Sequence, residues 1–85
     1  MKLRVLYFAA LRERVGRTEE MVNAPDSIHT VAQLREWLAQ RGDPWQGAFA
    51  ETRRVRVAVG KAMVEPDHAL HEGAEVAFFP PVTGG

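Results

Sequence analysis

The sequence contains no cysteine among its 85 residues. Without a thiol, the chain cannot form a disulfide bond, bind a metal through thiolates or use a cysteine nucleophile. It also lacks a long apolar run, since no stretch approaches the ~20 apolar residues of a membrane-spanning helix. The apolar start is interrupted by Arg4 and no small-residue cleavage site follows, which predicts a strand rather than a signal peptide. These absences favour a soluble, cytoplasmic protein with no membrane partner.

The sequence also lacks an excess of charge of either sign, because 11 basic residues balance 11 acidic ones. A chain without net charge has no long-range field that attracts nucleic acid or an anionic membrane. We therefore expect no nucleic-acid partner. The apolar fraction of 46% is ordinary for a globular protein, and the length suits one small domain.

Recognisable catalytic and metal-binding motifs are missing as well. No Ser-His-Asp set, glycine-rich phosphate loop or nucleotide fingerprint is visible. His68 and His71 fall in an expected loop with no third ligand, so we predict no metal site. Glu19 and Glu20 are adjacent on an expected edge strand, where neighbouring side chains point to opposite faces and cannot form an acid–base pair. We expect no catalytic site and no cofactor bound by this chain alone.

Alternating apolar residues predict strands in five places. The expected strands are residues 2–9, 18–23, 54–59, 62–64 and 75–79. The first and last are strongly apolar on both faces, which favours a central position for both.

One helix is expected over residues 31–41. Thr30 is the predicted N-cap, Gln33 completes a capping box, and Gly42 suits the C-terminal cap. A short helical turn is expected before Gly16. Residues 43–51 are expected to be irregular or a single turn that covers Trp45 and Phe49.

The order of these elements is strand, strand, helix, strand, short strand, strand. One helix of about three turns can cover one face of a mixed sheet of about five strands. This pattern favours an α+β fold of the ubiquitin-like β-grasp type. We expect the domain to span residues 1–79 and an extended tail to occupy residues 80–85.

Two aromatic residues are expected on the sheet face that the helix leaves open. Strand alternation turns Phe78 into the core but turns Phe8 and Phe79 outward, and Met63 on a short edge strand can join them. An exposed patch of aromatic and methionine side chains is typical of a partner-binding surface. The alternative is that residues 44–50 cover these side chains.

Arg53, Arg54 and Arg56 form a local basic cluster. A solvated outer strand face is the preferred interpretation, and a partner contact is the alternative.

The last six residues combine stiffness with small size. Pro80 and Pro81 favour an extended exit from the sheet, Val82 and Thr83 continue it, and Gly84 and Gly85 remove side-chain bulk. Six extended residues reach ~20 Å. Such a tail can carry a carboxylate into a narrow channel of another protein, although an inert end is the alternative.

Three stretches resemble a known family: "VLYFAALRERVG", "TVAQLREWLA" and "DHALHEGAEVAFFPPVTGG". They are similar to the small subunits of molybdopterin synthase, which are ubiquitin-like sulfur carriers. The likeness covers nearly the whole chain, and "VAFFPPVTGG" is its most specific part. The thiamine-pathway carriers also end in Gly-Gly, but they are typically shorter and lack this aromatic-proline run.

The resemblance implies a reaction at Gly85. In this family, a ubiquitin-activating-type adenylyltransferase uses ATP to adenylate the terminal carboxylate, and a sulfur donor system converts it to a thiocarboxylate. The tail then enters the large subunit of the synthase and donates sulfur to cyclic pyranopterin monophosphate, which forms the molybdopterin dithiolene. The family also suggests a heterotetramer of two small and two large subunits.

The resemblance further implies roles for the remaining residues. Phe8, Met63 and Phe79 would bind the activating enzyme and the large subunit in turn, and residues 80–84 would bind inside the partner's channel. Three alternatives stay open: a sulfur carrier for thiamine or tRNA thiolation, a protein modifier conjugated through Gly85, and a domain that only binds non-covalently.

Overall fold

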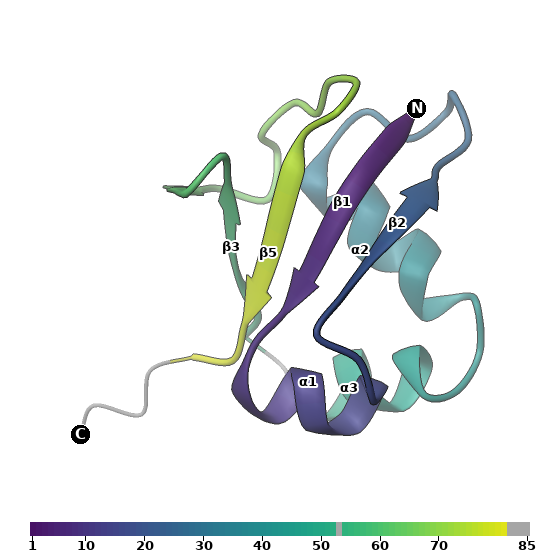
Figure 1. The fold of residues 1–85 in the computed structure, drawn as a ribbon, viewed down its shortest axis with the longest axis vertical. Helices are drawn as coiled ribbons and strands as arrows, with labels where there is room; N and C mark the ends of the chain where they lie inside the picture. The colour runs from purple at the N-terminus through teal and green to yellow at the C-terminus, as the bar shows by residue number, and fades with distance from the viewer. Residues whose placement is uncertain (53, 82–85) are drawn as a thin grey trace.

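The computed structural model describes residues 1–52 and 54–81. Within these ranges, five strands form one sheet and three helices pack against it (Figure 1). The strands are β1 (Lys2–Tyr7), β2 (Glu19–Asn23), β3 (Arg56–Val59), β4 (Ala62–Val64) and β5 (Glu75–Phe79). The helices are α1 (Ala9–Val15), α2 (Val31–Ala39) and α3 (Trp45–Glu51). None of the helices in the described ranges has the length and apolar character needed to span a bilayer.

The strand order is β2-β1-β5-β3-β4. β1 and β5 are parallel neighbours in the middle of the sheet, and the other pairs are antiparallel. The predicted α+β, ubiquitin-like β-grasp fold and the predicted central pair are therefore confirmed. Figure 1 shows α2 behind the sheet, and α1 and α3 at the end where β1 and β5 finish.

The core lies between α2, α3 and one face of the sheet. Strand alternation sends Val5 of β1 and Val76 of β5 to this face, and Leu34 of α2 meets them. The side chains with almost no exposure are Leu3, Val5, Tyr7, Leu11, Leu34, Leu38, Val76 and Phe78. The predicted inward facing of Phe78 is thus correct, at 1% exposure.

Helix α2 begins where the sequence predicts. The Thr30 hydroxyl accepts a hydrogen bond from the Gln33 backbone N–H at 3.2 Å, and the Gln33 side-chain oxygen accepts one from the Thr30 backbone N–H at 3.1 Å. The helix ends at Ala39, two residues before the predicted end, because Gln40 is the cap. Gly42 lies in the following turn with a φ of +88°, a conformation that glycine adopts without strain.

The prediction of a single main helix was incomplete. The turn expected before Gly16 is a full helix, α1, and the segment expected to be irregular contains a second one, α3. Helix α3 forms because its apolar side chains reach the core: Phe49 is 3% exposed and its ring meets that of Phe78 edge-on, with centroids 5.3 Å apart. Tertiary packing therefore stabilises a helix whose sequence contains Gly47 and has little helical periodicity.

Three strands are shorter than predicted. β1 ends at Tyr7 because Phe8 is already the N-cap of α1, and β2 begins at Glu19. β3 begins at Arg56 rather than Arg54, because Arg56 pairs with Phe79, the last residue of β5.

Candidate functional site

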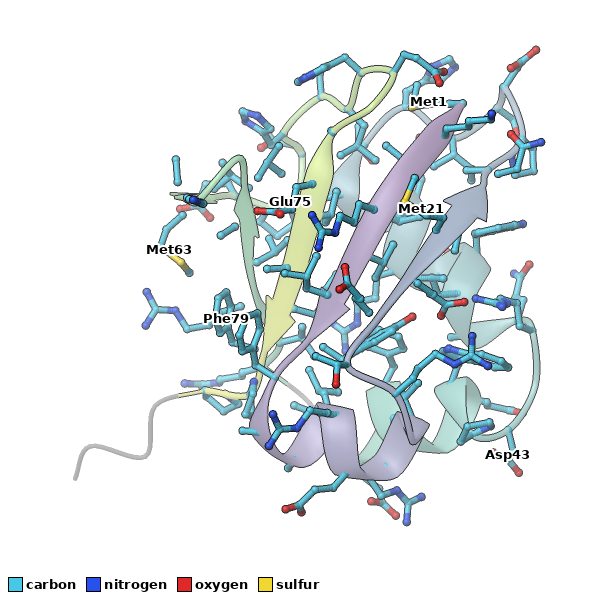
Figure 2. The ribbon with its side chains drawn as sticks, viewed as in Figure 1. Met1, Met21, Asp43, Met63, Glu75 and Phe79 are labelled. Atoms are coloured by element: carbon cyan, nitrogen blue, oxygen red, sulfur yellow. The ribbon has the colours of Figure 1, made fainter. Side chains whose placement is uncertain are left out.

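An open groove of about 580 Å³ lies where β5 leaves the sheet. Its lining comes from the start of α1, from β3 and β4, from the end of β5 and from the residues that follow it. The lining residues are Phe8, Ala9, Arg56, Met63, Phe79, Pro80 and Pro81. Five of these were predicted as partner-binding residues from the sequence, and the structure brings all five together; Ala9 and Arg56 were not among them. Figure 2 shows Met63 and Phe79 on the same side of the sheet, at the edge near β3.

Two stacked aromatic rings form the floor of this groove. The Phe8 and Phe79 ring centroids are 4.7 Å apart, and their planes differ by only 11°. The parallel pairing of β1 and β5 sets this contact, because Tyr7 is opposite Phe78 and the Phe8 backbone N–H donates to the Phe78 carbonyl oxygen at 3.1 Å. Since Tyr7 and Phe78 both point into the core, the residues after them both point outward.

The groove is apolar and open to solvent. Phe8 is 38% exposed and Met63 is 51% exposed, whereas Phe79, Pro80 and Pro81 are half-buried. Residues 44–50 do not line the groove, so the alternative that they cover it is wrong. Exposed large apolar side chains that gather in one hollow are typical of a protein-binding site.

Four of the predicted site residues lie outside the described residues. These are Val82, Thr83, Gly84 and Gly85. Arg53 of the basic cluster lies outside them as well. The chemical role of the Gly85 carboxylate therefore stays a prediction from the sequence.

Charged groups on the open face of the sheet pair among themselves. The Arg4 guanidinium contacts Glu19 through its Nε and lies 3.7 Å from a Glu75 carboxylate oxygen. The hydrogen bond and charge of Glu19 raise the pKa of Arg4, and the hydrogen bond from Arg4 lowers the pKa of Glu19. Both acidic groups therefore pair with the same arginine.

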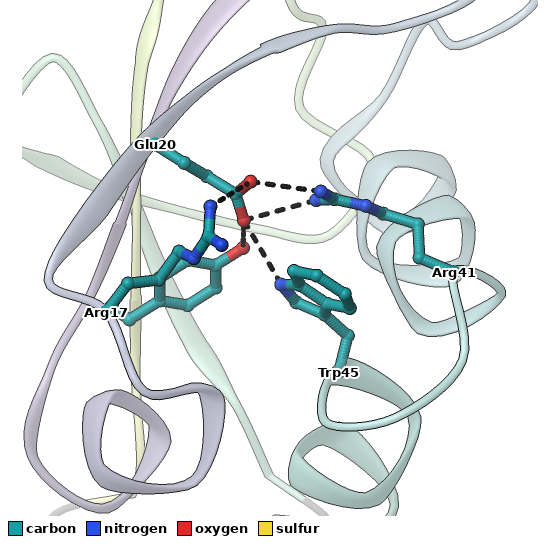
Figure 3. Close-up of polar contacts among 5 residues, drawn as sticks. Arg17, Glu20, Arg41 and Trp45 are labelled. Atoms are coloured by element: carbon teal, nitrogen blue, oxygen red, sulfur yellow. Dashed lines mark hydrogen bonds and ion pairs between the residues drawn. The ribbon is translucent and has the colours of Figure 1, made fainter.

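A second polar cluster lies at the other face of the sheet, around Glu20 (Figure 3). The Glu20 carboxylate accepts hydrogen bonds from the Tyr7 hydroxyl at 2.6 Å, from both terminal nitrogens of Arg41 at 3.1 Å and from the Trp45 Nε1 at 3.1 Å. Arg17 adds an ion pair at 3.3 Å. This cluster was missed by sequence reasoning, because its members are 3 to 25 residues from Glu20 along the chain.

Burial and hydrogen bonds shift the pKa values of Glu20 and Tyr7 in this second cluster. Burial raises the pKa of Glu20, but the hydrogen bonds from Arg41 and Tyr7 outweigh it and hold the pKa of that carboxyl below its usual value. Burial and the Glu20 carboxylate raise the pKa of the Tyr7 hydroxyl. The expectation that Glu19 and Glu20 point to opposite faces is confirmed, since Glu19 pairs with Arg4 on the open face.

A further groove of about 470 Å³ runs between α2, α3 and β3. Its one guanidinium, that of Arg35, donates to the carbonyl oxygens of Phe49 and Thr52 at 3.2 Å, and burial lowers the pKa of this group. Arg35 thus satisfies carbonyl groups at the end of α3. In residues 1–52 and 54–81, no group of three or more His, Asp or Glu side chains is arranged to hold a metal ion.

Comparison with known proteins identifies the family. A model of the ThiS family matches residues 5–85. The molybdopterin synthase sulfur carrier subunit of Escherichia coli K12 is 45% identical over 83 residues, which cover 98% of this chain and 99% of that protein.

Solved structures agree with this assignment. A Pyrococcus furiosus protein named for subunit 1 of molybdopterin converting factor is 31% identical, with a TM-score of 0.77 over 96% of this chain and 99% of its own. A complex of subunits 1 and 2 of molybdopterin-converting factor from Helicobacter pylori 26695 contains a chain that is 20% identical with a TM-score of 0.66, covering 100% of both chains, which shows the shared fold. The resemblance seen in the sequence is therefore confirmed: this chain belongs to the ThiS family of ubiquitin-like sulfur carriers.

Proposed function

We propose that this chain is the sulfur carrier subunit of a molybdopterin synthase and that the carboxyl group of Gly85 carries the sulfur. The full-length likeness to a molybdopterin synthase sulfur carrier subunit supports the proposal. The family match also extends through residue 85, so it includes the Gly84-Gly85 pair.

One observation in the structure carries this proposal: the apolar groove includes the first residues of the tail. Pro80 and Pro81 line the groove together with the stacked rings of Phe8 and Phe79. Gly85 follows Pro81 by four residues, so it can reach at most ~14 Å from Pro81. A partner that covers the groove therefore receives Gly85 within a short, defined distance of the contact.

The chemistry follows from the reactivity of a carboxylate. A free carboxylate is a poor acylating group, so an adenylyltransferase of the ubiquitin-activating type first joins it to AMP from ATP and releases pyrophosphate. A sulfur donor system then displaces AMP and leaves a thiocarboxylate at Gly85. The large subunit of the synthase binds this thiocarboxylate beside cyclic pyranopterin monophosphate, which receives the sulfur during formation of the dithiolene.

The chain acts in this scheme as a reagent that is consumed and recharged. It has no catalytic site of its own, binds no cofactor and works in the cytoplasm as the donor subunit of a two-chain sulfurtransferase. The ATP is used by the activating partner. Two carriers on a symmetric dimer of large subunits form a heterotetramer.

The test is the intact mass of the chain after activation. The full chain is incubated with the activating enzyme, ATP and a sulfur donor, and we expect one oxygen to be replaced by sulfur. Fragmentation of the product should place the sulfur on Gly85. Deletion of Gly85 is the control, and it should prevent the exchange while the far-ultraviolet circular dichroism stays unchanged.

Two results would contradict the proposal. A chain that acquires no sulfur with the complete activating system is not a sulfur carrier. A chain recovered from cell extracts with Gly85 in isopeptide linkage to lysines of other proteins is a modifier instead.

A further inference from the structure

Arg56 differs from the rest of the basic cluster because it lines the apolar groove. The register of β3 and β5 pairs Arg56 with Phe79, and directly paired residues project on the same face of a sheet. Met63 follows on the adjacent strand, since its pairing partner is Ala58, two residues beyond Arg56. Arg56 is thus an exposed charged residue that lines the groove together with apolar side chains.

The described part of the chain provides no carboxylate for this guanidinium. None of the salt bridges among the described residues involves Arg56. Glu19 and Glu75, which lie on the same face, are both held by Arg4. Glu65 and Arg56 line a neighbouring hollow without forming an ion pair.

Covering the groove changes the energetics of this charge. Arg56 is solvated while the groove is open, so it needs no partner within the chain. A protein that packs onto Phe8, Phe79 and Met63 also removes water from Arg56. A charge that loses its water without gaining hydrogen bonds or a counter-charge is strongly unfavourable. The covering protein must therefore supply an acceptor, and a carboxylate matches the fork of a guanidinium best.

We propose that Arg56 is a specificity-determining residue of the docking groove, and that the large synthase subunit places an Asp or Glu carboxylate against it. This inference rests on the proposed function, because it takes the large subunit as the protein that covers the groove. The basic cluster was interpreted from the sequence mainly as a solvated strand face. In the structure, Arg56 lines the groove and Arg54 does not. The interpretation as a solvated strand face therefore fits Arg54 but not Arg56.

The test compares the affinities of four variants and the wild-type chain for the purified large subunit by calorimetry. Arg56→Gln should weaken binding by at least about 30-fold, because it leaves the partner carboxylate buried without a counter-charge. Arg54→Gln removes the same charge nearby and should stay within about threefold, as a rim charge does. Thermal unfolding of both variants should match the wild type, because both side chains are exposed.

Two further variants separate this inference from the proposed function. Met63→Glu places a charge in the groove, whereas Met21→Glu makes the same change at an exposed methionine outside it. If Met63→Glu weakens binding and Arg56→Gln does not, the Arg56 inference is overturned and the docking groove stands. If Met63→Glu binds as well as Met21→Glu, the groove does not dock the large subunit. The docking role of the groove and the Arg56 inference then both fail.

Salt dependence provides a second readout. A buried ion pair that forms on binding makes the affinity fall with rising sodium chloride concentration, and loss of one member reduces that dependence. We expect the affinity of Arg56→Gln to depend less on salt than the affinity of the wild type. An equal dependence in both proteins would mean that Arg56 contributes packing rather than charge, which would overturn the inference.

Discussion

At the scale of single residues, Glu20 connects parts of the chain that no local interaction would hold together. Its side chain is only 6% exposed, and its carboxylate receives donors from β1, from the segment before β2, and from both ends of the connection between α2 and α3. The Arg41 guanidinium lies 3.9 Å from the centroid of the Trp45 ring, so a cation–π contact adds to the cluster. A buried, fully bonded carboxylate of this kind stabilises one arrangement of these segments.

Replacement of Glu20 by Gln should lower the free energy of unfolding by about 2–3 kcal/mol at neutral pH, because Arg41 loses its counter-charge and an amide nitrogen faces other donors. Chemical denaturation measures this loss. Glu19→Gln on the open face is the matched control and should have a much smaller effect, because that carboxylate is exposed.

The Glu20→Gln variant should also show a weaker dependence of stability on acid pH. The pKa of Glu20 in the folded state lies below its usual value of 4.5, so its contribution is complete above that pH and is lost as the pH falls through the lower folded value. Wild-type stability should therefore decline more steeply below about pH 4.5 than that of Glu20→Gln. Parallel pH profiles for the two proteins would mean that Glu20 is not bound as described.

At the scale of elements, α2 is the helix whose start the sequence predicted best. A capping box needs only Thr30 and Gln33 at the right spacing, so a local pattern was sufficient. Helix α3 could not be predicted in the same way, because it depends on Phe49 reaching Phe78 across the core. The register that limits β3 to Arg56–Val59 is likewise set by β5, which lies far away in the sequence.

The cap of α2 yields a prediction at this scale. Thr30→Ala removes the hydroxyl that accepts the Gln33 N–H and should cost about 1 kcal/mol of stability. For a domain of this size, this cost corresponds to a decrease in Tm of about 4–8 °C. Thr30→Ser keeps the hydroxyl and should retain most of the stability in the same thermal scan. Equal losses in the two variants would place the contribution in the Thr30 methyl group rather than in the cap.

At the scale of the whole molecule, the proposed docking groove and the proposed sulfur-carrying group lie in different parts of the chain. The groove is lined by residues of the folded domain and by Pro80 and Pro81 at the start of the tail, whereas we propose that sulfur transfer occurs at Gly85. Deletion of Gly85 should leave the affinity for the large subunit within about threefold, because the groove carries the hot-spot contacts. Phe79→Glu should weaken that affinity by at least about tenfold. Titration calorimetry and the rate of molybdopterin formation together measure the two effects.

The opposite results for these two variants would show that binding of the large subunit and sulfur transfer do not depend on separate parts of the chain. A Gly85 deletion that abolishes binding would place the main contact in the tail. An unchanged affinity of the Phe79→Glu variant would mean that the groove is not part of the interface. Met21→Glu is again the control, because it adds the same charge at an exposed site away from the groove.

Much of the docking groove could be predicted from the sequence, because strand alternation alone turns Phe8 and Phe79 outward. That their rings stack follows from the parallel register of β1 and β5, which the alternation does not specify. The inclusion of Arg56 depends on the register of β3 against β5. Sequence reasoning could therefore place individual side chains on a face, but the contacts across strands required the structure.

The parallel pairing of β1 and β5 also has a mechanical consequence. The two strands run side by side from Arg4 opposite Glu75 to Tyr7 opposite Phe78, and Figure 1 shows the N-terminus at one end of this pair and the exit of β5 at the other. A pull on the chain beyond Phe79, resisted at Met1, therefore loads these hydrogen bonds together in shear instead of opening them one at a time. The sheet can thus resist a partner that draws residues 80 and beyond toward itself, without losing its central strand.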